Sequence, residues 1–446
     1  MTGTRRDRSF GGPLSALLRP VLTPGWREVV VERVGATVLV RSARHDDPLL
    51  RAFAAELPAG PLSVVVDEEA PQVAVSERLV ALLAARAKRG LDEARVLAPE
   101  GLTGITASRW RRLAERTGVA LLVPAGPVSI AGTTLFAAGG WVRWAPGEPG
   151  RSVGPRHPVP SWQEEESAVF PTVHGGLIAE QLPLGVLLRP PSAFPVLDWC
   201  SVPPDPHRLT VVAGVPGGPP ARAADVAAHL AGLPPEVCAA ARLVSGDGQD
   251  VVALGRAVAE LLGTAVTVAD GVPVERGGGL GFVLHDAAGR PTWEPYLGEI
   301  RCRAGERTAA PLRWRAPHPG LAAHAPGVFR VAEGWVLGVM RSGLWLRQAG
   351  RAAQPVPVGA PVDPAVVTVA VGDPGHPLAD DVWDVLPGLL DRLDPAVLRR
   401  VRLSVLGVPS AAGREAACAL ARERGLGLRP GRRAEPVRAR SAFGGA

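Results

Sequence analysis

The stretch LTVVAGVPGG at residues 209–218 decides how we interpret the rest of the chain, because an unbroken apolar run ends there in a glycine- and proline-rich turn. A helical run at 221–233 comes next, then a second strand at 242–245, a second helical run at 251–262 and a third strand at 265–269. Short apolar runs that do not alternate with polar residues are typical of parallel strands covered on both faces. This part of the chain therefore predicts a β-α-β-α-β unit.

The same unit occurs three times. Arg95, Arg242 and Arg402 open the second strand of each copy, 147 and 160 residues apart. The first strands are related by nearly the same offsets, through Ser63, Thr210 and Thr368. A period this long indicates repeated domains and not a solenoid of small stacked repeats. A hairpin pattern precedes each unit, and the third copy stops before the closing hairpin, which is either missing or replaced by the tail.

These patterns predict the fold class α/β, with three repeated α/β/α sandwich-like domains whose sheets are mainly parallel and extended by a β-hairpin. Pro- and Gly-rich linkers at 146–166 and 303–326 separate the domains. The predicted organisation is a flexible arm at 1–24, repeats at 25–150, 168–302 and 327–430, and a basic tail at 431–446.

Composition narrows the functional classes. The formal net charge of +6 is small for 446 residues, and Lys88 is the only lysine. Acidic residues are mixed with the arginines, so we expect no nucleic-acid partner for the bulk of the chain. No window has the length of an apolar membrane span, and the N-terminal apolar run is too short for a signal peptide, so we expect a cytoplasmic protein. The four cysteines show no CxxC spacing and predict neither a metal site nor a disulfide framework.

Strand two of the second copy, ARLVS at 241–245, is followed by a helix and the strand AV at 265–266, and WEP at 293–295 closes the copy. This layout resembles the degenerate caspase-like modules of large actinobacterial toxin-type proteins, over about a hundred residues of each copy. The resemblance implies a cysteine-peptidase fold, with a histidine after strand one and a cysteine after strand two. This chain has other residues at those strand ends: Asp67, Gly214 and Gly372 in place of histidine, and Pro99, Gly246 and Leu406 in place of cysteine. If the resemblance holds, all three copies have lost the peptidase dyad.

The spacing of the glycines and histidines does not support nucleotide or metal binding. The glycines at 214–218 lack the dinucleotide fingerprint, and Pro219 and Pro220 remove backbone donors that a phosphate needs. The nine histidines form no HxH or HExxH pattern. We therefore predict no catalytic residues, no cofactor and no metal, whereas the sequence leaves open whether the protein binds a small-molecule ligand.

Tryptophans concentrate in the hairpins of a chain that is otherwise poor in aromatics. They either cap the sheet of their own domain or anchor another chain or the neighbouring repeat. The candidates for interaction are Trp141, Trp144, Trp293, Trp335 and Trp345.

The leading functional hypothesis is a non-catalytic scaffold or protein-interaction protein, of the kind found in an actinobacterial secretion or toxin-type assembly. Two alternatives stay open. One is a divergent hydrolase or cysteine peptidase-like enzyme that uses residues we do not recognise, and the other is binding of an anionic partner through the arginine-rich tail.

Overall fold

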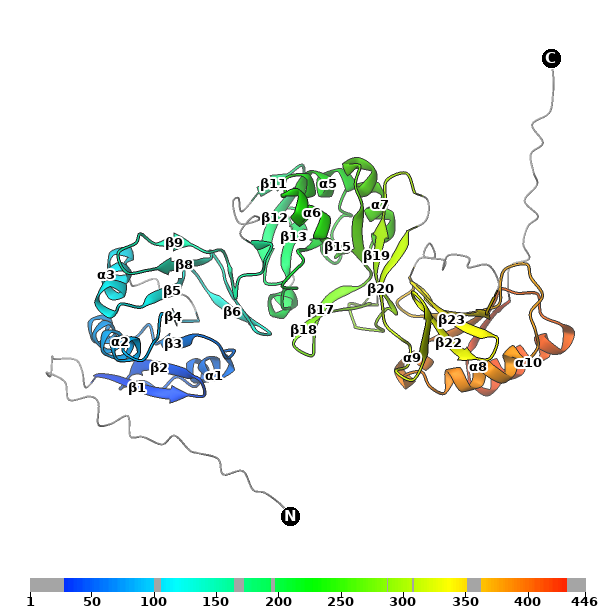
Figure 1. The fold of residues 1–446 in the computed structure, drawn as a ribbon, viewed down its shortest axis with the longest axis horizontal. Coiled ribbons are helices and arrows are strands. Elements are labelled where there is room, and N and C mark those ends of the chain that lie inside the picture. The colour runs from blue at the N-terminus through cyan, green and yellow to red at the C-terminus, as the bar shows by residue number, and fades with distance from the viewer. Residues whose placement is uncertain are drawn as a thin grey trace, which may run out of the picture. The chain divides into compact units, whose positions relative to one another are not determined.

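The computed structural model describes residues 28–99, 106–163, 172–193, 197–286, 288–306, 309–350 and 362–430. Three large sheets follow one another along the described chain, each with helices packed against it (Figure 1). Repeated α/β domains are therefore present, as the sequence predicts. Residues 154–446 with 129–136 form one compact unit, and the rest of the N-terminal part forms another.

Copy one has the strand order β1-β2-β3-β4-β5-β8-β9. The strands are β1 (Val29–Val34), β2 (Thr37–Ser42), β3 (Leu62–Val66), β4 (Glu93–Leu97), β5 (Ala120–Pro124), β8 (Trp141–Trp144) and β9 (Arg151–Ser152). The helices are α1 (Pro48–Glu56), α2 (Gln72–Ala87) and α3 (Ala107–Thr117). A small separate sheet contains β6 (Val128–Ala131), β7 (Thr134–Ala137) and β10 (Arg156–His157).

Copy two has the order β11-β12-β13-β14-β15-β16-β19-β20. Its strands are β11 (Thr172–His174), β12 (Leu177–Leu182), β13 (Gly185–Arg189), β14 (Thr210–Ala213), β15 (Arg242–Ser245), β16 (Val266–Ala269), β19 (Leu297–Cys302) and β20 (Ala310–Trp314). Its helices are η3 (Leu197–Ser201), α5 (Ala223–Ala231), α6 (Pro235–Ala240) and α7 (Val251–Leu262), and β17 (Val272–Arg276) pairs with β18 (Gly279–Val283) as a separate hairpin.

Copy three has the order β21-β22-β23-β24-β25-β26-β27. Its strands are β21 (Ala322–Ala325), β22 (Val328–Ala332), β23 (Trp335–Met340), β24 (Gly343–Gln348), β25 (Val367–Val371), β26 (Val401–Val405) and β27 (Gly427–Pro430). The helices are α8 (Val382–Leu390), α9 (Pro395–Leu398) and α10 (Ala411–Glu423).

The three copies share one strand register. Strand-two arginines pair with equivalent positions of the third parallel strand, through Arg95–Leu122, Arg242–Thr267 and Arg402–Gly427. Each arginine also pairs on its other side with the first-strand residue Ser63, Thr210 or Thr368. Residues that the sequence offsets predict to be equivalent are thus equivalent in space.

Local sequence explains where the helices begin and end. Asp47, Asp250 and Ser410 precede α1, α7 and α10, and their side chains accept hydrogen bonds from the first backbone N–H groups. Gly118 and Gly263 follow α3 and α7 with a left-handed backbone, which a residue with a side chain adopts at a cost.

Alternate strand residues face the helices. In copy two, Val211, Leu243 and Val268 pack with α5, α6 and α7 in one hydrophobic cluster that continues into copy three. On the opposite face, Leu187 and Val212 contact the 3₁₀-helix η3 and the β17–β18 hairpin. The second outer layer of copy two is therefore a short helix and a hairpin, since no long amphipathic helix is encoded there.

The linkers are shorter than the sequence predicts. Residues 303–326 contain β20 and β21, and residues 146–166 contain β9 and β10. Their proline and arginine content concealed these short edge strands, on which proline is tolerated. The helical run at 221–233 ends earlier than predicted, and the separate helix α6 comes after it. The predicted hairpin start at Val169 and Phe170 lies outside the described residues.

Gly185 and Gly343 provide a test of the shared hairpin-to-strand junction. Both have positive φ, +154° and +140°, and a Cβ added there would lie 2.0 and 2.2 Å from the carbonyl oxygens of Thr210 and Thr368. We expect Gly185→Ala or Gly343→Ala to lower the free energy of unfolding by at least about 2 kcal/mol, because the backbone must move. Urea unfolding followed by circular dichroism measures this.

The matched control is Gly388→Ala in α8, where a Cβ meets nothing within 4 Å. Alanine has the higher helix propensity, so this variant should be as stable as the native chain or more so. Equal stability of all three variants would contradict the close approach at the junction.

Candidate functional site

The rim formed by the carboxyl ends of the parallel strands is the first place to look for reactive groups in an α/β domain. In copy one this rim holds Asp67, whose side chain is buried. Its Oδ2 accepts a hydrogen bond from Ser42 N at 2.9 Å and its Oδ1 accepts one from Glu69 N at 3.0 Å. The carboxylate therefore ties β2 to the loop after β3.

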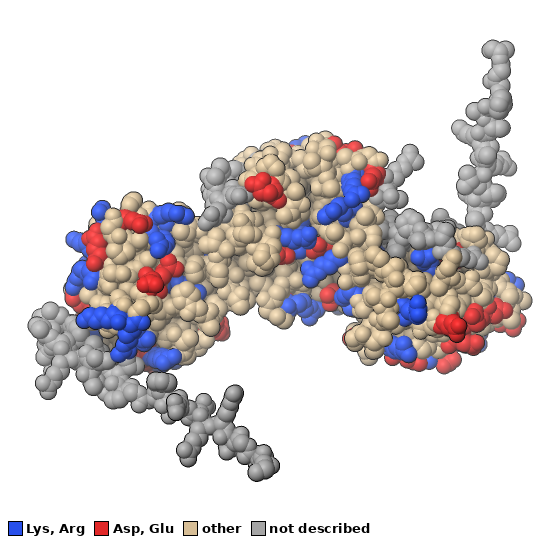
Figure 2. Space-filling view, viewed as in Figure 1, with Lys and Arg blue, Asp and Glu red and all other residues tan. Residues whose placement is uncertain are grey.

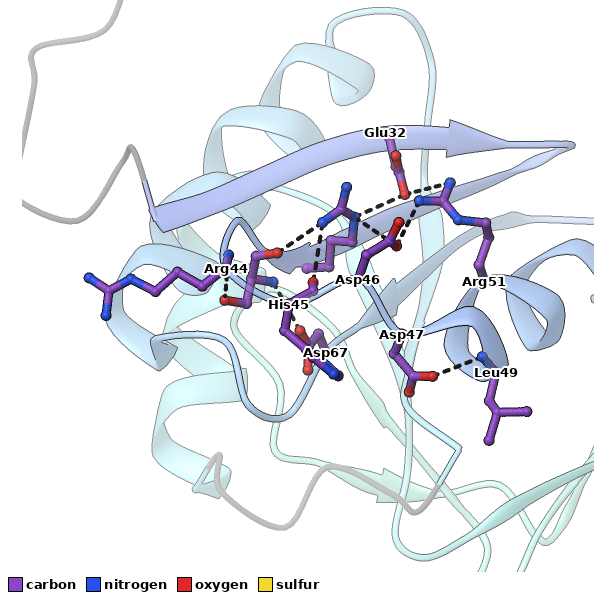
Figure 3. Close-up of polar contacts among 10 residues, drawn as sticks. Glu32, Arg44, His45, Asp46, Asp47, Leu49, Arg51 and Asp67 are labelled. Atoms are coloured by element: carbon purple, nitrogen blue, oxygen red, sulfur yellow. Dashed lines mark hydrogen bonds and ion pairs between the residues drawn. The ribbon is translucent and has the colours of Figure 1, made fainter.

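A group of partly exposed charges lies near Asp67 (Figure 3). Arg41 lies 3.2 Å from Glu32, and Arg51 contacts both Glu32 at 3.0 Å and Asp46 at 2.9 Å. The hydrogen bond from Arg51 lowers the pKa of Asp46. Because solvent screens such pairs, they contribute little to stability. Their charges neutralise one another.

In copy two the rim is closed by Asp247, which sequence reasoning did not single out. Its Oδ1 accepts from Ser245 Oγ and Gln249 N, and its Oδ2 accepts from Ala221 N and Gln249 Nε2, at 2.8–3.1 Å. Gly214 is required beneath it, since a Cβ there would lie 2.5 Å from Asp247 Oδ2. The carboxylate thus fixes the loops after β14 and β15.

In copy three the rim contains the buried Asp373 and the apolar side chains of Trp345 and Leu406. Trp345 Nε1 donates to Gly372 O at 2.9 Å, and Leu406 packs against the buried Trp345. His376 is exposed, and its backbone N–H donates to Asp373 O at 3.1 Å. The residue directly after strand two in this copy is Leu406 and not a cysteine.

The predicted strand-end positions thus lie on three separate rims. Pro99 accepts a hydrogen bond from Val128 N through its carbonyl, and Gly246 lies against Gly214 O, where a Cβ would be only 2.3 Å away. Within the described residues no group of three or more His, Cys, Asp or Glu side chains is arranged to hold a metal ion. Asp247 was missed because its GDGQD context resembles an ordinary polar turn.

None of the four cysteines lies at the carboxyl end of a parallel strand. Burial raises the pKa of Cys200 and Cys238, and it raises the pKa of the fully buried Cys302 to about 11. Cys418 lies in α10 and is exposed. A raised pKa disfavours the thiolate, which is the nucleophilic form.

Four of the five hairpin tryptophans are buried. Trp141, Trp335 and Trp345 are at most 2 % exposed, Trp293 is 3 % exposed, and Trp144 is half-buried. In this structure the four buried rings therefore cap their own sheets and are not open to an external chain. Trp293 does reach the neighbouring copy, because its Nε1 donates to Asp363 O at 3.2 Å.

A buried ion pair joins copies two and three. Arg341, in the β23–β24 turn, is 1 % exposed, and its guanidinium lies 2.7 Å from both Asp270 and Asp250. Burial opposes the charge of Arg341, but the two carboxylates hold its pKa above the ordinary value. Burial likewise opposes the charge of Asp250, yet the hydrogen bond from Arg341 lowers its pKa below 3.8. Arg341 and Asp250 therefore both carry their charge at neutral pH.

Copy two also has a cavity of about 190 Å³ beside β18 and β20. Phe282, Tyr296 and Trp314 are among its lining residues, and Arg315 stacks on the Tyr296 ring with 4.4 Å to the centroid. The lining carboxylate of Glu299 already binds Arg242. The carboxylate of Glu299 in the cavity lining is therefore used in an ion pair within the fold.

Comparison with known proteins adds no assignment. No protein-family model matches the sequence, and a search of curated proteins finds no significant similarity. The resemblance to caspase-like modules therefore stays a hypothesis.

Replacing Arg341 tests the joint. Arg341→Met leaves the carboxylate of Asp270 buried without a counter-charge, so we expect a loss of about 3–5 kcal/mol in the free energy of unfolding. Differential scanning calorimetry of the full chain measures the loss. Adding Asp270→Leu should recover much of it, because a buried pair can be replaced by apolar side chains at small cost.

Arg290→Met is the surface control. Arg290 is 78 % exposed and lies 2.8 Å from Asp286, so its loss should leave the unfolding transition nearly unchanged. If Arg341→Met behaved in the same way, the ion pair would not hold the two copies together.

Proposed function

We propose that this chain is a non-catalytic, protein-binding scaffold built from three copies of one α/β domain. The proposal rests on the contacts that side chains make at the carboxyl ends of the parallel strands. The carboxylates of Asp67 and Asp247 accept hydrogen bonds from their own loops, and the corresponding rim of copy three is packed with Trp345 and Leu406. Groups held in this way maintain loop shape.

The joint at Arg341 supports a scaffold in a second way. A charge pair that is buried between two domains fixes the arrangement in which they pack, and the apolar side chains around it oppose separation because they would be exposed to water. Copies two and three share one compact unit and one continuous hydrophobic cluster. A stiff body of two domains holds its surfaces at a constant spacing, which is what a scaffold requires.

The surface is compatible with selective protein contacts. Basic and acidic side chains are interspersed on the visible face (Figure 2), so it carries no extended field of one sign. None of the helices in the described part of the chain has the length and hydropathy that crossing a bilayer requires. The arginine-rich tail proposed for an anionic partner lies outside the described residues.

The resemblance to caspase-like modules suggests the setting. Within that hypothesis the copies are modules that lost the dyad and kept the sheet, as a part of an actinobacterial secretion or toxin-type assembly. The alternative, a divergent cysteine hydrolase, requires a thiol of raised reactivity.

Thiol labelling separates these two functions. At pH 7.5 we expect iodoacetamide to modify Cys418 of the native full chain first, because that side chain is exposed. Cys302 should react only after unfolding, since with a pKa of about 11 fewer than about one thiol in a thousand is ionised. Mass spectrometry of labelled peptides over time gives the four rates, and the same chain in urea is the reference.

A hydrolase is indicated instead if Cys200, Cys238 or Cys302 in the native chain reacts faster than in urea. The scaffold itself is tested by affinity capture of the full chain from its own cells, with and without Cys418→Ser. A partner recovered in equal amounts from both supports the scaffold. Absence of any stoichiometric partner would contradict it.

A further inference from the structure

The edge of β27 differs from the equivalent edges in the other two copies. In copy one the third parallel strand, β5, is covered by the antiparallel strand β8, and in copy two β16 is covered by β19. In copy three β27 is the last strand of the sheet among the described residues. An uncovered edge exposes backbone donors and acceptors that pair readily with another strand.

The third parallel strand is also buried to a different extent in the three copies. Every residue of β5 and β16 is buried. In β27, Gly427 and Arg429 are exposed and Leu428 is only half-buried. The position that copies one and two bury beneath a closing strand is therefore open to solvent in copy three.

Copy two shows what a closing strand contributes. The strand-two residue Arg242 is 1 % exposed, and its Nη2 lies 2.6 Å from Oε1 of Glu299. Glu299 belongs to β19, the closing strand. The guanidinium thus reaches across β16 to a carboxylate on the strand beyond it.

Copy three has the arginine without this carboxylate. Arg402 is equivalent to Arg242 by register and is exposed. A Cβ built on Gly427 would lie 3.4 Å from Arg402 Cγ and 3.7 Å from its Nε, so the Arg402 side chain lies over the glycine, beside the open edge. Neither Arg402 nor Arg429 has an ion-pair partner in the described part of the chain.

The pairing of β16 with β19 in copy two indicates where a carboxylate of a partner strand would lie beside β27. Thr267 pairs with Arg301 and Val268 with Ile300, so Glu299 lies beside Ala269 when the pairing is extended by one residue. Gly427 is equivalent to Thr267, which makes Arg429 the equivalent of Ala269. Side chains of one strand alternate between faces, so Arg402, Gly427 and Arg429 share a face of the sheet. A carboxylate opposite Arg429 would therefore meet two arginines.

We propose that the open edge of β27 binds an extended acidic segment of a partner protein, which adds to the sheet as an antiparallel strand. An Asp or Glu of that segment lies opposite Arg429, in the position that Glu299 occupies in copy two, and binds Arg402. The backbone provides the strand pairing, and the two arginines select the acidic sequence. This inference names the partner chemistry for the scaffold function proposed above and rests on it.

Charge argues against two other occupants. The chain's own residues after β27 include Arg432, Arg433, Arg438 and Arg440, which would place like charges beside Arg402. A second copy paired through the same edge would bring two sets of arginines together. Like charges directly across a strand pair are destabilising, whereas opposite charges stabilise it.

A peptide titration tests the proposal. The probe is a fluorescently labelled peptide that copies residues 296–302 with Arg301→Thr and Cys302→Ser, so that Glu299 is its only charged side chain. The comparison peptide adds Glu299→Gln. Fluorescence anisotropy with the full chain should give a Kd at least about fivefold lower for the Glu peptide, because a charge-assisted hydrogen bond is lost in the Gln peptide.

A double-mutant cycle assigns the effect to the two arginines. In the full-chain variant Arg402→Gln/Arg429→Gln the two peptides should bind equally, and in Arg330→Gln, which changes an exposed arginine on β22, the fivefold difference should remain. Hydrogen exchange at residues 427–429 should slow on binding of the Glu peptide.

Equal binding of both peptides to the native chain, or a preference that survives Arg402→Gln/Arg429→Gln, would overturn the proposal. If the Glu peptide bound more tightly only after removal of residues 431–446, the tail would be the occupant and the proposal would also fail. The affinity capture described above is independent of this titration. A captured partner together with a failed titration therefore rejects the β27 site and leaves the scaffold function in place.

Discussion

A guanidinium that is buried away from water needs carbonyl or carboxylate oxygens as hydrogen-bond acceptors. This requirement applies at several places in the described structure. Arg156 is fully buried and donates to the carbonyls of Leu182, Pro183 and Gly185 in the β12–β13 turn. Arg341, in the equivalent turn of copy three, is buried against Asp270 and Asp250 of copy two. In both places an arginine ties a hairpin turn to a neighbouring segment, and leaving either one unpaired would cost several kcal/mol.

The same requirement explains why the copies diverged at strand two while keeping its register. Arg95 donates to the carbonyls of Pro58 and Pro61, and Arg242 binds the carboxylate of Glu299. Copy three leaves Arg402 exposed, where water satisfies the guanidinium. One ancestral position thus has three different environments, because a long cation can find its acceptor in several directions while the strand pairing beneath it stays the same.

The fold could be predicted largely from sequence because its signals are local. Unbroken apolar runs such as 209–213 and 62–66, helix caps such as Asp250, and the glycines at helix ends each act within a few residues. The short edge strands lack such a local signal, and the sequence analysis therefore missed them. The strand APLRW of β20 contains a proline and an arginine, and only its neighbour β19 gives it a partner.

The rims could not be predicted in the same way, because they depend on contacts between residues that are far apart in the chain. Asp67 and Asp247 both stand in acidic turns, and whether such a carboxylate is free or bound depends on which N–H groups surround it. Asp247 receives Ala221 N from 26 residues away, and Asp67 receives Ser42 N from 25 residues away. Glu299 lies 57 residues from Arg242. A sequence gives the residue types of such a pair but does not show that the two residues contact each other. Differences in side-chain contacts between the repeated copies are therefore found only when their strands are compared in register.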